Sequence, residues 1–331
     1  MKRKVCFDFV KGYFVLAMAV YHWMNYCIIG HDLVYKYVDY VSEGFIFFSG
    51  YLCGEVYFYR FKENKIGVIK RLGIRSVKIF CLFVFLNVII YTFLGGARGS
   101  SGDISVYGVF VQRFYDVFIV GDDSLMAFEI LLPISYMLAL CPLFFFSFRV
   151  TLSFFILILV YLFVANIGGV PASYNAKALM IGFGGICTSM LLNHISCKRA
   201  VYINAVSIIM AIVYFAIFVP FIHISGIMVK YVEINIVVLN LIIVCHALCK
   251  RSLFVSELSM LGKFSLLLYL FQILYLQIVS LFLVQKNSYF TGEVLGVLLL
   301  LLLTSSLLCR AVSFGRRISP IFDRMYMIVF Q

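Results

Sequence analysis

Charged side chains are scarce in this chain. Of its 331 residues, 13% are Asp, Glu, Lys or Arg, whereas 64% are hydrophobic. A water-soluble protein of this length cannot hide so large an apolar share, because its surface needs more polar side chains than this sequence supplies. The composition therefore excludes a soluble globular protein and predicts a chain whose solvent is mainly lipid.

Cysteine patterns typical of zinc sites or redox motifs are also missing. The ten cysteines fall mostly within apolar stretches, where we interpret them as small packing residues. Cys245 and Cys249 are one helical turn apart, but no carboxylate lies near them in the sequence, so packing is the favoured interpretation. We therefore expect no metal site.

The basic residues, which give the chain a net charge of +12, are not gathered into one solvated domain. They lie between apolar runs, which argues against nucleic acid as a partner. If residues 1–4 are cytoplasmic, most of the 27 lysines and arginines fall on the cytoplasmic side. This distribution predicts that both termini are cytoplasmic and that the chain is a multi-pass protein of the bacterial inner membrane. No small-residue cleavage site follows the first apolar run, so we expect that run to be retained as a span.

Apolar runs of spanning length follow one another along the whole chain. A membrane-spanning helix needs about 20 mostly apolar residues, and about ten runs qualify by length and polar breaks. They cover residues 11–30, 40–59, 77–95, 125–147, 150–167, 175–194, 200–220, 232–249, 264–284 and 292–312. The longest connections, at 60–78 and 95–123, are too short for a separate catalytic domain, and no internal repeat is evident. The sequence thus predicts an all-α, polytopic transmembrane bundle of about ten helices that forms one domain over residues 1–331.

The first run places a histidine deep in the predicted membrane. Lys11 and His22 are eleven positions apart, which on a helix returns to within about 20° of the same face and places the imidazole about 16 Å above the lysine. Two interpretations stay open. His22 is either a packing residue that hydrogen-bonds a neighbouring helix, with Lys11 as a snorkelling anchor, or a functional group, as ionisable residues at this depth usually are.

Other polar residues stand out against their apolar surroundings. Glu43 and Glu129 are carboxylates in the outer halves of two predicted spans, where they either serve chemistry or form helix-to-helix hydrogen bonds. Arg71 and Arg75, one turn apart before the third span, either clamp the phosphates of a donor or anchor the helix at the cytoplasmic surface. The favoured interpretation of Gly50 and the glycine that follows it one turn later, at position 54, is close helix packing.

These segments resemble a known family. The spacing Asp8-x2-Lys11-x10-His22 is similar to the first-helix signature of the acyltransferase-3 family of integral membrane acyltransferases, which has arginine at the position of Lys11. The segments 42–52 and 128–136 resemble the branch of that family that contains the periplasmic-glucan succinyltransferase. Residues 261–272 look like its Gly-x2-Ser-x3-Tyr-x2-His segment, with glutamine in place of the last histidine.

The resemblance implies roles for individual residues. It implies catalysis by His22 and, taken with the reasoning above, a site of three parts. The expected catalytic residues are His22, Glu43 and Glu129; the residues expected to bind the donor are Lys11, Arg71 and Arg75; those expected to contact the substrate are Asp8, Ser49, Tyr136, Tyr269 and Gln272.

The expected function is O-acyl transfer. The donor would be cytoplasmic acyl-CoA, with acetyl-CoA favoured, and the acceptor a hydroxyl of a surface or periplasmic glycan or lipid-linked oligosaccharide, such as O-antigen. Direct transfer with histidine as general base and an acyl-histidine intermediate both stay open. Two other functions fit a polytopic chain with intramembrane charges: a lipid-linked oligosaccharide flippase and a surface-polysaccharide polymerase.

Overall fold

The computed structural model describes residues 5–27, 37–38, 40–58, 65–93, 106–121, 126–143, 153, 156–157, 160, 173–194, 233–242, 253–282 and 292–330. Every regular element in these ranges is a helix. The all-α prediction is therefore confirmed for the described part of the chain.

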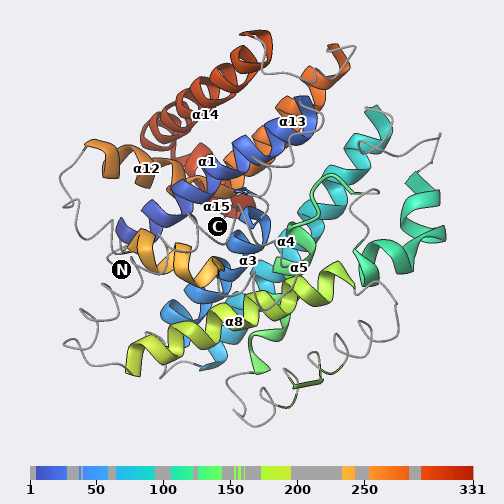
Figure 1. Ribbon diagram of the computed structural model, residues 1–331, viewed down its shortest axis with the longest axis vertical. Helices are drawn as coiled ribbons and strands as arrows, with labels where there is room; N and C mark the ends of the chain where they lie inside the picture. Colours follow the sequence, from blue (N-terminus) through green and yellow to red (C-terminus); the bar gives the residue numbers. More distant parts are fainter. Residues whose placement is uncertain are drawn as a thin grey trace. The chain divides into compact units, whose positions relative to one another are not determined.

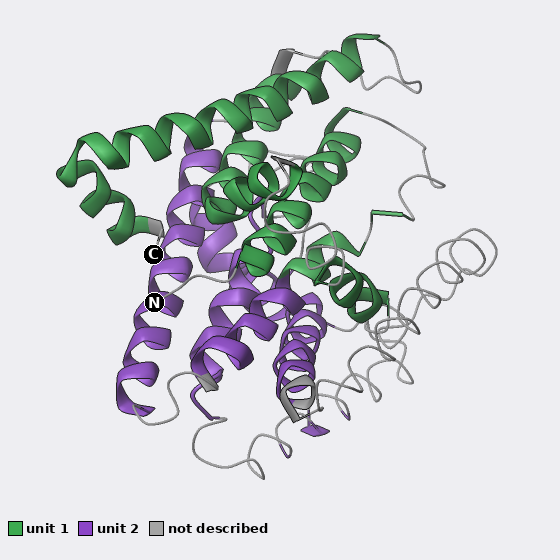
Figure 2. Cartoon of the chain, turned by 90° about the vertical axis from the view of Figure 1, so that its left-hand side faces the viewer, with its two compact units in different colours: residues 1–45, 196–331 green, residues 46–195 purple. Residues whose placement is uncertain are grey.

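The helices fall into two compact units, which Figure 2 shows in different colours. Unit 1 comprises residues 1–45 and 196–331, and unit 2 comprises residues 46–195. Unit 1 contains α1 (Val5–Cys27), a helix at Glu233–Ile242, α12 (Leu253–Lys263), α13 (Ser265–Phe282), α14 (Gly292–Ile318) and α15 (Pro320–Phe330). Unit 2 contains η1 (Cys53–Phe58), α4 (Lys65–Phe93), η2 (Gly108–Gln112), η3 (Tyr115–Val120), α5 (Leu131–Leu140) and α8 (Tyr174–His194), and α3 (Val41–Leu52) crosses the boundary. The expectation of one domain over residues 1–331 stays a prediction.

Three of the described helices, α1, α4 and α14, are long and apolar enough to cross a membrane. A fourth candidate is the pair α12–α13, which is bent by 79° at Phe264. The total of about ten spans stays a prediction. The predicted run at 200–220 and most of the run at 150–167 lie outside the described residues.

Two segments that the sequence suggested as connections are partly helical. α4 begins at Lys65, so the basic stretch before the third predicted span continues that span as helix; its lysines, arginines, leucines and isoleucines are compatible with this. The segment 95–123 contains the π-helices η2 and η3, whose wider turns are visible in the bonds from Arg113 N to Gly108 O (3.1 Å) and from Gly121 N to Asp116 O (2.8 Å).

Unit 1 is organised around α1, which packs against α12, α13 and α14 (Figure 1). Two glycines bring α1 and α12 into backbone contact. A Cβ atom at Gly12 would collide with the carbonyl of Leu258, and one at Gly262 would collide with the carbonyl of Asp8. Such close approach between helices requires residues without side chains on both surfaces.

Farther along α1, an apolar cluster joins it to α13 and α14. Trp23 is buried there with Ala19 from α1, Leu276 from α13 and Leu301 from α14. The indole Nε1 of Trp23 also donates a hydrogen bond to the carbonyl of Val294 (2.7 Å). A buried indole that satisfies its only donor in this way fixes the relative position of helices as well as supplying apolar area.

Unit 2 contains a second close helix contact, between α3 and α8. A Cβ atom at Gly50 would collide with the carbonyl of Gly182, and one at Gly185 would collide with the carbonyl of Phe47. Gly54 faces the side chain of Ser189. The helix-packing interpretation of the Gly50-x3-Gly54 pair is therefore confirmed.

The π-helix η3 is held by side chains from α5 and from the start of α8. Tyr136 Oη donates to the carbonyl of Phe118 (3.0 Å), as does Asn175 Nδ2 (3.1 Å). Ser173 Oγ lies 2.6 Å from the carbonyl of Ile119 and 3.0 Å from that of Val120. Carbonyls at the end of a helix lack later donors, so these side chains complete their hydrogen bonding.

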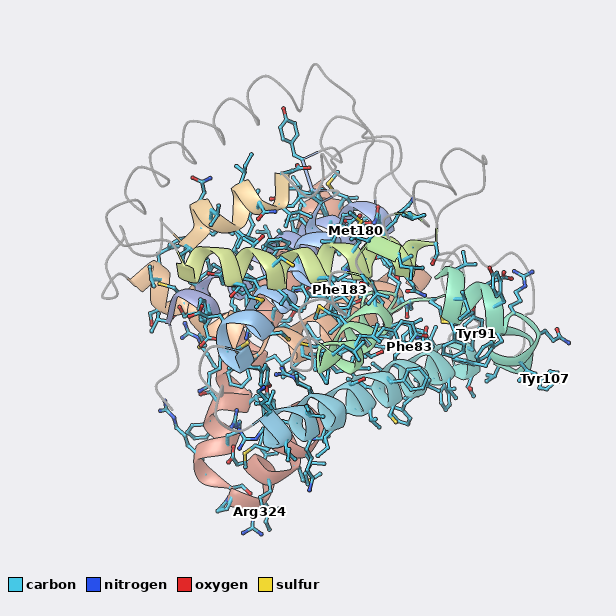
Figure 3. All side chains as sticks on the ribbon, turned by 90° about the horizontal axis from the view of Figure 1, so that it is seen from below. Phe83, Tyr91, Tyr107, Met180, Phe183 and Arg324 are labelled. Atoms are coloured by element: carbon cyan, nitrogen blue, oxygen red, sulfur yellow. The ribbon has the colours of Figure 1, made fainter. Side chains whose placement is uncertain are left out.

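Phenylalanine rings surround the same turn. The ring of Phe118 contacts Phe80 and Phe83 of α4, at centroid distances of 5.9 and 6.3 Å, and Phe114 at 4.7 Å. Figure 3 labels Phe83 on α4. The ring of Phe118 thus anchors η3 in an aromatic cluster beside α4.

We expect Ser173→Ala to loosen η3, because it removes the hydroxyl that serves two carbonyls. The cost should be about 1 kcal/mol, the usual net contribution of one hydrogen bond, because these bonds are only partly buried. Native-state hydrogen exchange of the amides in residues 115–121 measures it. Thr92→Ala is the matched control, since that hydroxyl bonds the carbonyl of Val88 in its own helix at an exposed position. Equal exchange in both variants would contradict the assignment.

Candidate functional site

The candidate site centres on His22 in the second half of α1. Lys11 and His22 lie on this one unbroken helix, as the sequence predicted. The histidine is 8% exposed, so its ring lies inside unit 1. Its place on α1 is two turns beyond Val15.

Helix α13 covers the same side of α1. The ring of Tyr269 lies 6.0 Å from the imidazole of His22, measured between centroids, with the planes tilted by 48°. One turn later, Gln272 Nε2 donates to the backbone carbonyl of Val15 at 3.2 Å. The structure therefore brings together three of the predicted site residues, His22, Tyr269 and Gln272, at the contact between α1 and α13 (Figure 1).

Polar atoms at this contact are left without hydrogen bonds. Nε2 of His22 and Oε1 of Gln272 are both buried, and neither has a hydrogen-bond partner within the described ranges. The neighbouring Trp23, by contrast, donates to Val294. A buried polar group without a partner costs about 1–3 kcal/mol, so such atoms are uncommon in a fold and are candidates for binding a ligand.

This observation bears on the two interpretations of His22 that the sequence left open. A purely structural histidine in an apolar helix contact is expected to hydrogen-bond a neighbouring helix. Nε2 does not do so among the described residues. Among the described residues, this imidazole nitrogen therefore has no structural partner, and neutral imidazole can accept a proton at such an atom.

At the other end of α1, Lys11 and Asp8 form an ion pair. Their side chains are one turn apart, with Lys11 Nζ 3.9 Å from Asp8 Oδ1. Asp8 is buried and Lys11 half-buried. The negative charge in the first turn also suits the positive end of the helix dipole. Lys11, whose charge Asp8 neutralises in part, thus lies on the same face of α1 as His22.

The segment that carries Glu43 packs against α1. Tyr40 and Tyr13 share a hydrogen bond between their hydroxyl groups (2.7 Å), and the hydroxyl of Ser42 lies 4.0 Å from the sulfur of Met18. Glu43 follows in the first turn of α3 and is half-buried.

The remaining predicted site residues belong to unit 2. Arg71 and Arg75 are exposed and one turn apart on α4, beyond its first turn. Ser49 is half-buried on α3, and Glu129 is half-buried in the turn before α5. Tyr136 donates its hydroxyl to Phe118, so a structural contact accounts for that polar group.

Gln277 and Ser305 are among the buried polar side chains that were not singled out from the sequence. Both amide atoms of Gln277 on α13, and Oγ of Ser305 on α14, are buried without hydrogen-bond partners in the described part of the chain. Ser305 lies on the inward side of α14, between Leu301 and Cys309. An amide in the middle of an apolar run was the signal available for Gln277, since such groups are rare within membranes.

Comparison of the chain with protein-family models, curated proteins and solved structures found no match. The resemblance to the acyltransferase-3 family therefore rests on the short segments quoted above.

Proposed function

We propose that this protein is a membrane-bound O-acyltransferase, in which His22 is the general base. It transfers an acyl group, acetyl being favoured, from cytoplasmic acyl-CoA to a hydroxyl of a surface or periplasmic glycan. The chain lies in the bacterial inner membrane as a bundle of about ten spans with both termini cytoplasmic. A mid-membrane base suits a donor and an acceptor that arrive from opposite sides.

One observation carries the proposal. Nε2 of His22 is buried on α1 without a partner among the described residues, while the polar groups of Trp23 and Tyr136 are satisfied. Since Nε2 is sealed from solvent, an acceptor reaches it only after the side chains around it move apart. Tyr269 lies beside the imidazole and Gln272 is bonded to Val15 on the same helix contact, so we expect an entering sugar to meet them there.

The chemical step uses the imidazole twice. The acceptor hydroxyl gives its proton to Nε2 of His22 while its oxygen attacks the thioester carbonyl. The carbon–sulfur bond then breaks, the acyl group stays on the sugar as an ester, and the imidazolium returns the proton to the departing thiolate of CoA. No covalent bond to the protein is required.

Basic residues serve the donor in this proposal. Acyl-CoA carries several phosphate charges, and the exposed pair Arg71 and Arg75 presents two guanidinium groups one turn apart. Lys11 contributes a further positive charge on the face of α1 that also carries His22. Glu43 then binds sugar hydroxyls or orients the imidazole, and Glu129 binds sugar hydroxyls.

Mass analysis of surface glycan from a strain that lacks this protein tests the function class. The proposal expects the glycan to keep its chain length and abundance and to lose its acyl groups. Loss of export would instead indicate a flippase, and shortened chains would indicate a polymerase; either result overturns the proposal.

Gln272→Leu separates a role in substrate binding from a role in folding. Leucine removes the unpartnered Oε1 and also the bond from Nε2 to the Val15 carbonyl, and it keeps the side-chain volume. The two effects offset each other in part, so the free energy of unfolding should fall by no more than about 1–2 kcal/mol. The kcat/KM for the glycan should fall by about tenfold, the effect of losing one hydrogen bond to substrate. Acyl-transfer kinetics and thermal unfolding on the same preparation measure both. A loss of stability with unchanged kcat/KM would assign Gln272 to the fold.

A further inference from the structure

Helix α15 carries a strip of exposed apolar side chains. Ile321 is 72% exposed, Met325 62% and Ile328 65%. At 100° per residue these three fall, together with Phe322 and Val329, within an arc of about 120°. In water such an arc would be unfavourable, so it calls for an apolar environment.

The orientation of this arc is fixed by contacts elsewhere on the helix. Asp323 accepts an ion-pair bond from Arg316 (2.6 Å), and the guanidinium of Arg316 lies 4.4 Å from the centroid of the Tyr326 ring. Tyr326 in turn meets the edge of Phe264 at 5.7 Å, at the bend between α12 and α13. Ser319 caps the helix by accepting a bond from Phe322 N (3.2 Å). These contacts hold the apolar arc outward.

The position of α15 in the chain places it beside a membrane. It follows α14, a spanning candidate with exposed leucines at positions 299, 303 and 307. Arg316 and Arg317 end α14, as basic residues do where a spanning helix leaves the hydrocarbon. α15 begins just after them, at Pro320, and therefore starts at the membrane surface.

The exposed charges near the arc are positive. Arg317 and Arg324 are exposed, whereas the one acidic residue of α15, Asp323, is paired with Arg316. Figure 3 shows the side chain of Arg324 pointing away from the helices. Arginines that flank an apolar helix face are typical of helices that lie in an anionic membrane surface.

We propose that α15 is an interfacial helix whose apolar arc enters the membrane that α14 crosses and whose arginines, Arg317 and Arg324, bind anionic lipid headgroups. The partner is the lipid surface rather than a second copy of the chain, because a two-fold pairing of this face would bring like charges together. The inference goes beyond acyl transfer and does not depend on it.

The test for insertion places an indole on each side of α15. Met325 lies in the apolar arc and Met327 outside it, and both are exposed. The full chain carries Met325→Trp or Met327→Trp in nanodiscs that contain lipid brominated near the top of the acyl chains. The buried Trp23 supplies a common background, measured on the unaltered chain.

We expect the brominated lipid to quench the emission of Met325→Trp strongly, and acrylamide to quench that of Met327→Trp. Equal quenching of both variants by acrylamide would overturn the proposal. The proposal would also be overturned if the indole of Met325→Trp were protected from acrylamide only in nanodiscs that hold two copies of the protein. That result would identify a second chain as the partner.

The charge component is tested in nanodiscs of phosphatidylcholine with and without about 30% phosphatidylglycerol, a composition that supplies an anionic surface. Anionic lipid should raise the ratio of inserted to free helix by about fivefold for each arginine that binds it. Arg317→Gln with Arg324→Gln should abolish the increase. Lys65→Gln with Lys70→Gln removes the same charge from exposed positions of α4 and should leave it intact. The same insertion in neutral and anionic lipid would refute headgroup binding.

Discussion

Gly262→Ala is expected to prevent the normal packing of unit 1. The added methyl group would occupy the position of the Asp8 carbonyl on α1, and that carbonyl belongs to backbone rather than to a side chain that can rotate away. α1 and α12 would have to separate. We expect a loss of more than about 3 kcal/mol in the free energy of unfolding, at the upper end of overpacking effects.

Thermal unfolding in detergent, followed by the emission of the single tryptophan, measures this loss. Trp23 is buried in the same unit, so its emission changes when the unit unfolds. Gly296→Ala is the matched control: nothing lies within 4 Å of a Cβ atom at that position of α14. The control should be unchanged or slightly more stable, because alanine favours helix over glycine. Equal melting of the two variants would show that the backbone contact between α1 and α12 is absent.

His22→Ala is expected to remove glycan O-acylation while the protein still inserts and folds. General-base catalysis contributes about 10²–10⁴ in rate, so residual transfer should be at most about 1% of normal. The variant loses the packing of the ring, which lowers the free energy of unfolding. It also loses a buried Nε2 atom that has no hydrogen-bond partner among the described residues, and this offsets part of that cost. Membrane abundance and glycan mass, determined in the same cells, measure both effects.

The neighbouring residue supplies the control. Trp23→Phe removes the bond to Val294 and part of a buried ring, so it should lower stability by about 1–3 kcal/mol. It should retain acylation per folded molecule, because the indole is engaged in packing. A pattern in which Trp23→Phe loses activity as completely as His22→Ala would assign both residues to the fold alone.

Several of the described helices were readable from the sequence, because apolar runs bounded by charges and turns are a direct signal. The run predicted at 175–194 is α8, Tyr174–His194, and the run at 264–284 is α13, Ser265–Phe282. The bend at Phe264 was not readable, since α12 before it is amphipathic and its direction is set by the contact of Gly262 with Asp8. A tertiary contact of that kind leaves no local pattern.

The candidate site was predictable in part. The shared face of Lys11 and His22 follows from helix geometry, and the structure bears it out on α1. Tyr269 was included in the site only through the family resemblance, and its contact with His22 was not predicted, because spacing within α13 does not say which helix it faces. The missing partner of Nε2 depends on the positions of atoms from several helices, so only a structure reveals it.

The most direct measurement is the initial rate of acyl transfer from labelled acetyl-CoA to acceptor glycan by purified, reconstituted protein, with and without His22→Ala. The account predicts a rate at least about 100-fold lower in the variant, with α1 still inserted and the melting temperature nearly unchanged. A variant that transfers the acyl group as fast as the unaltered protein would contradict the role of His22.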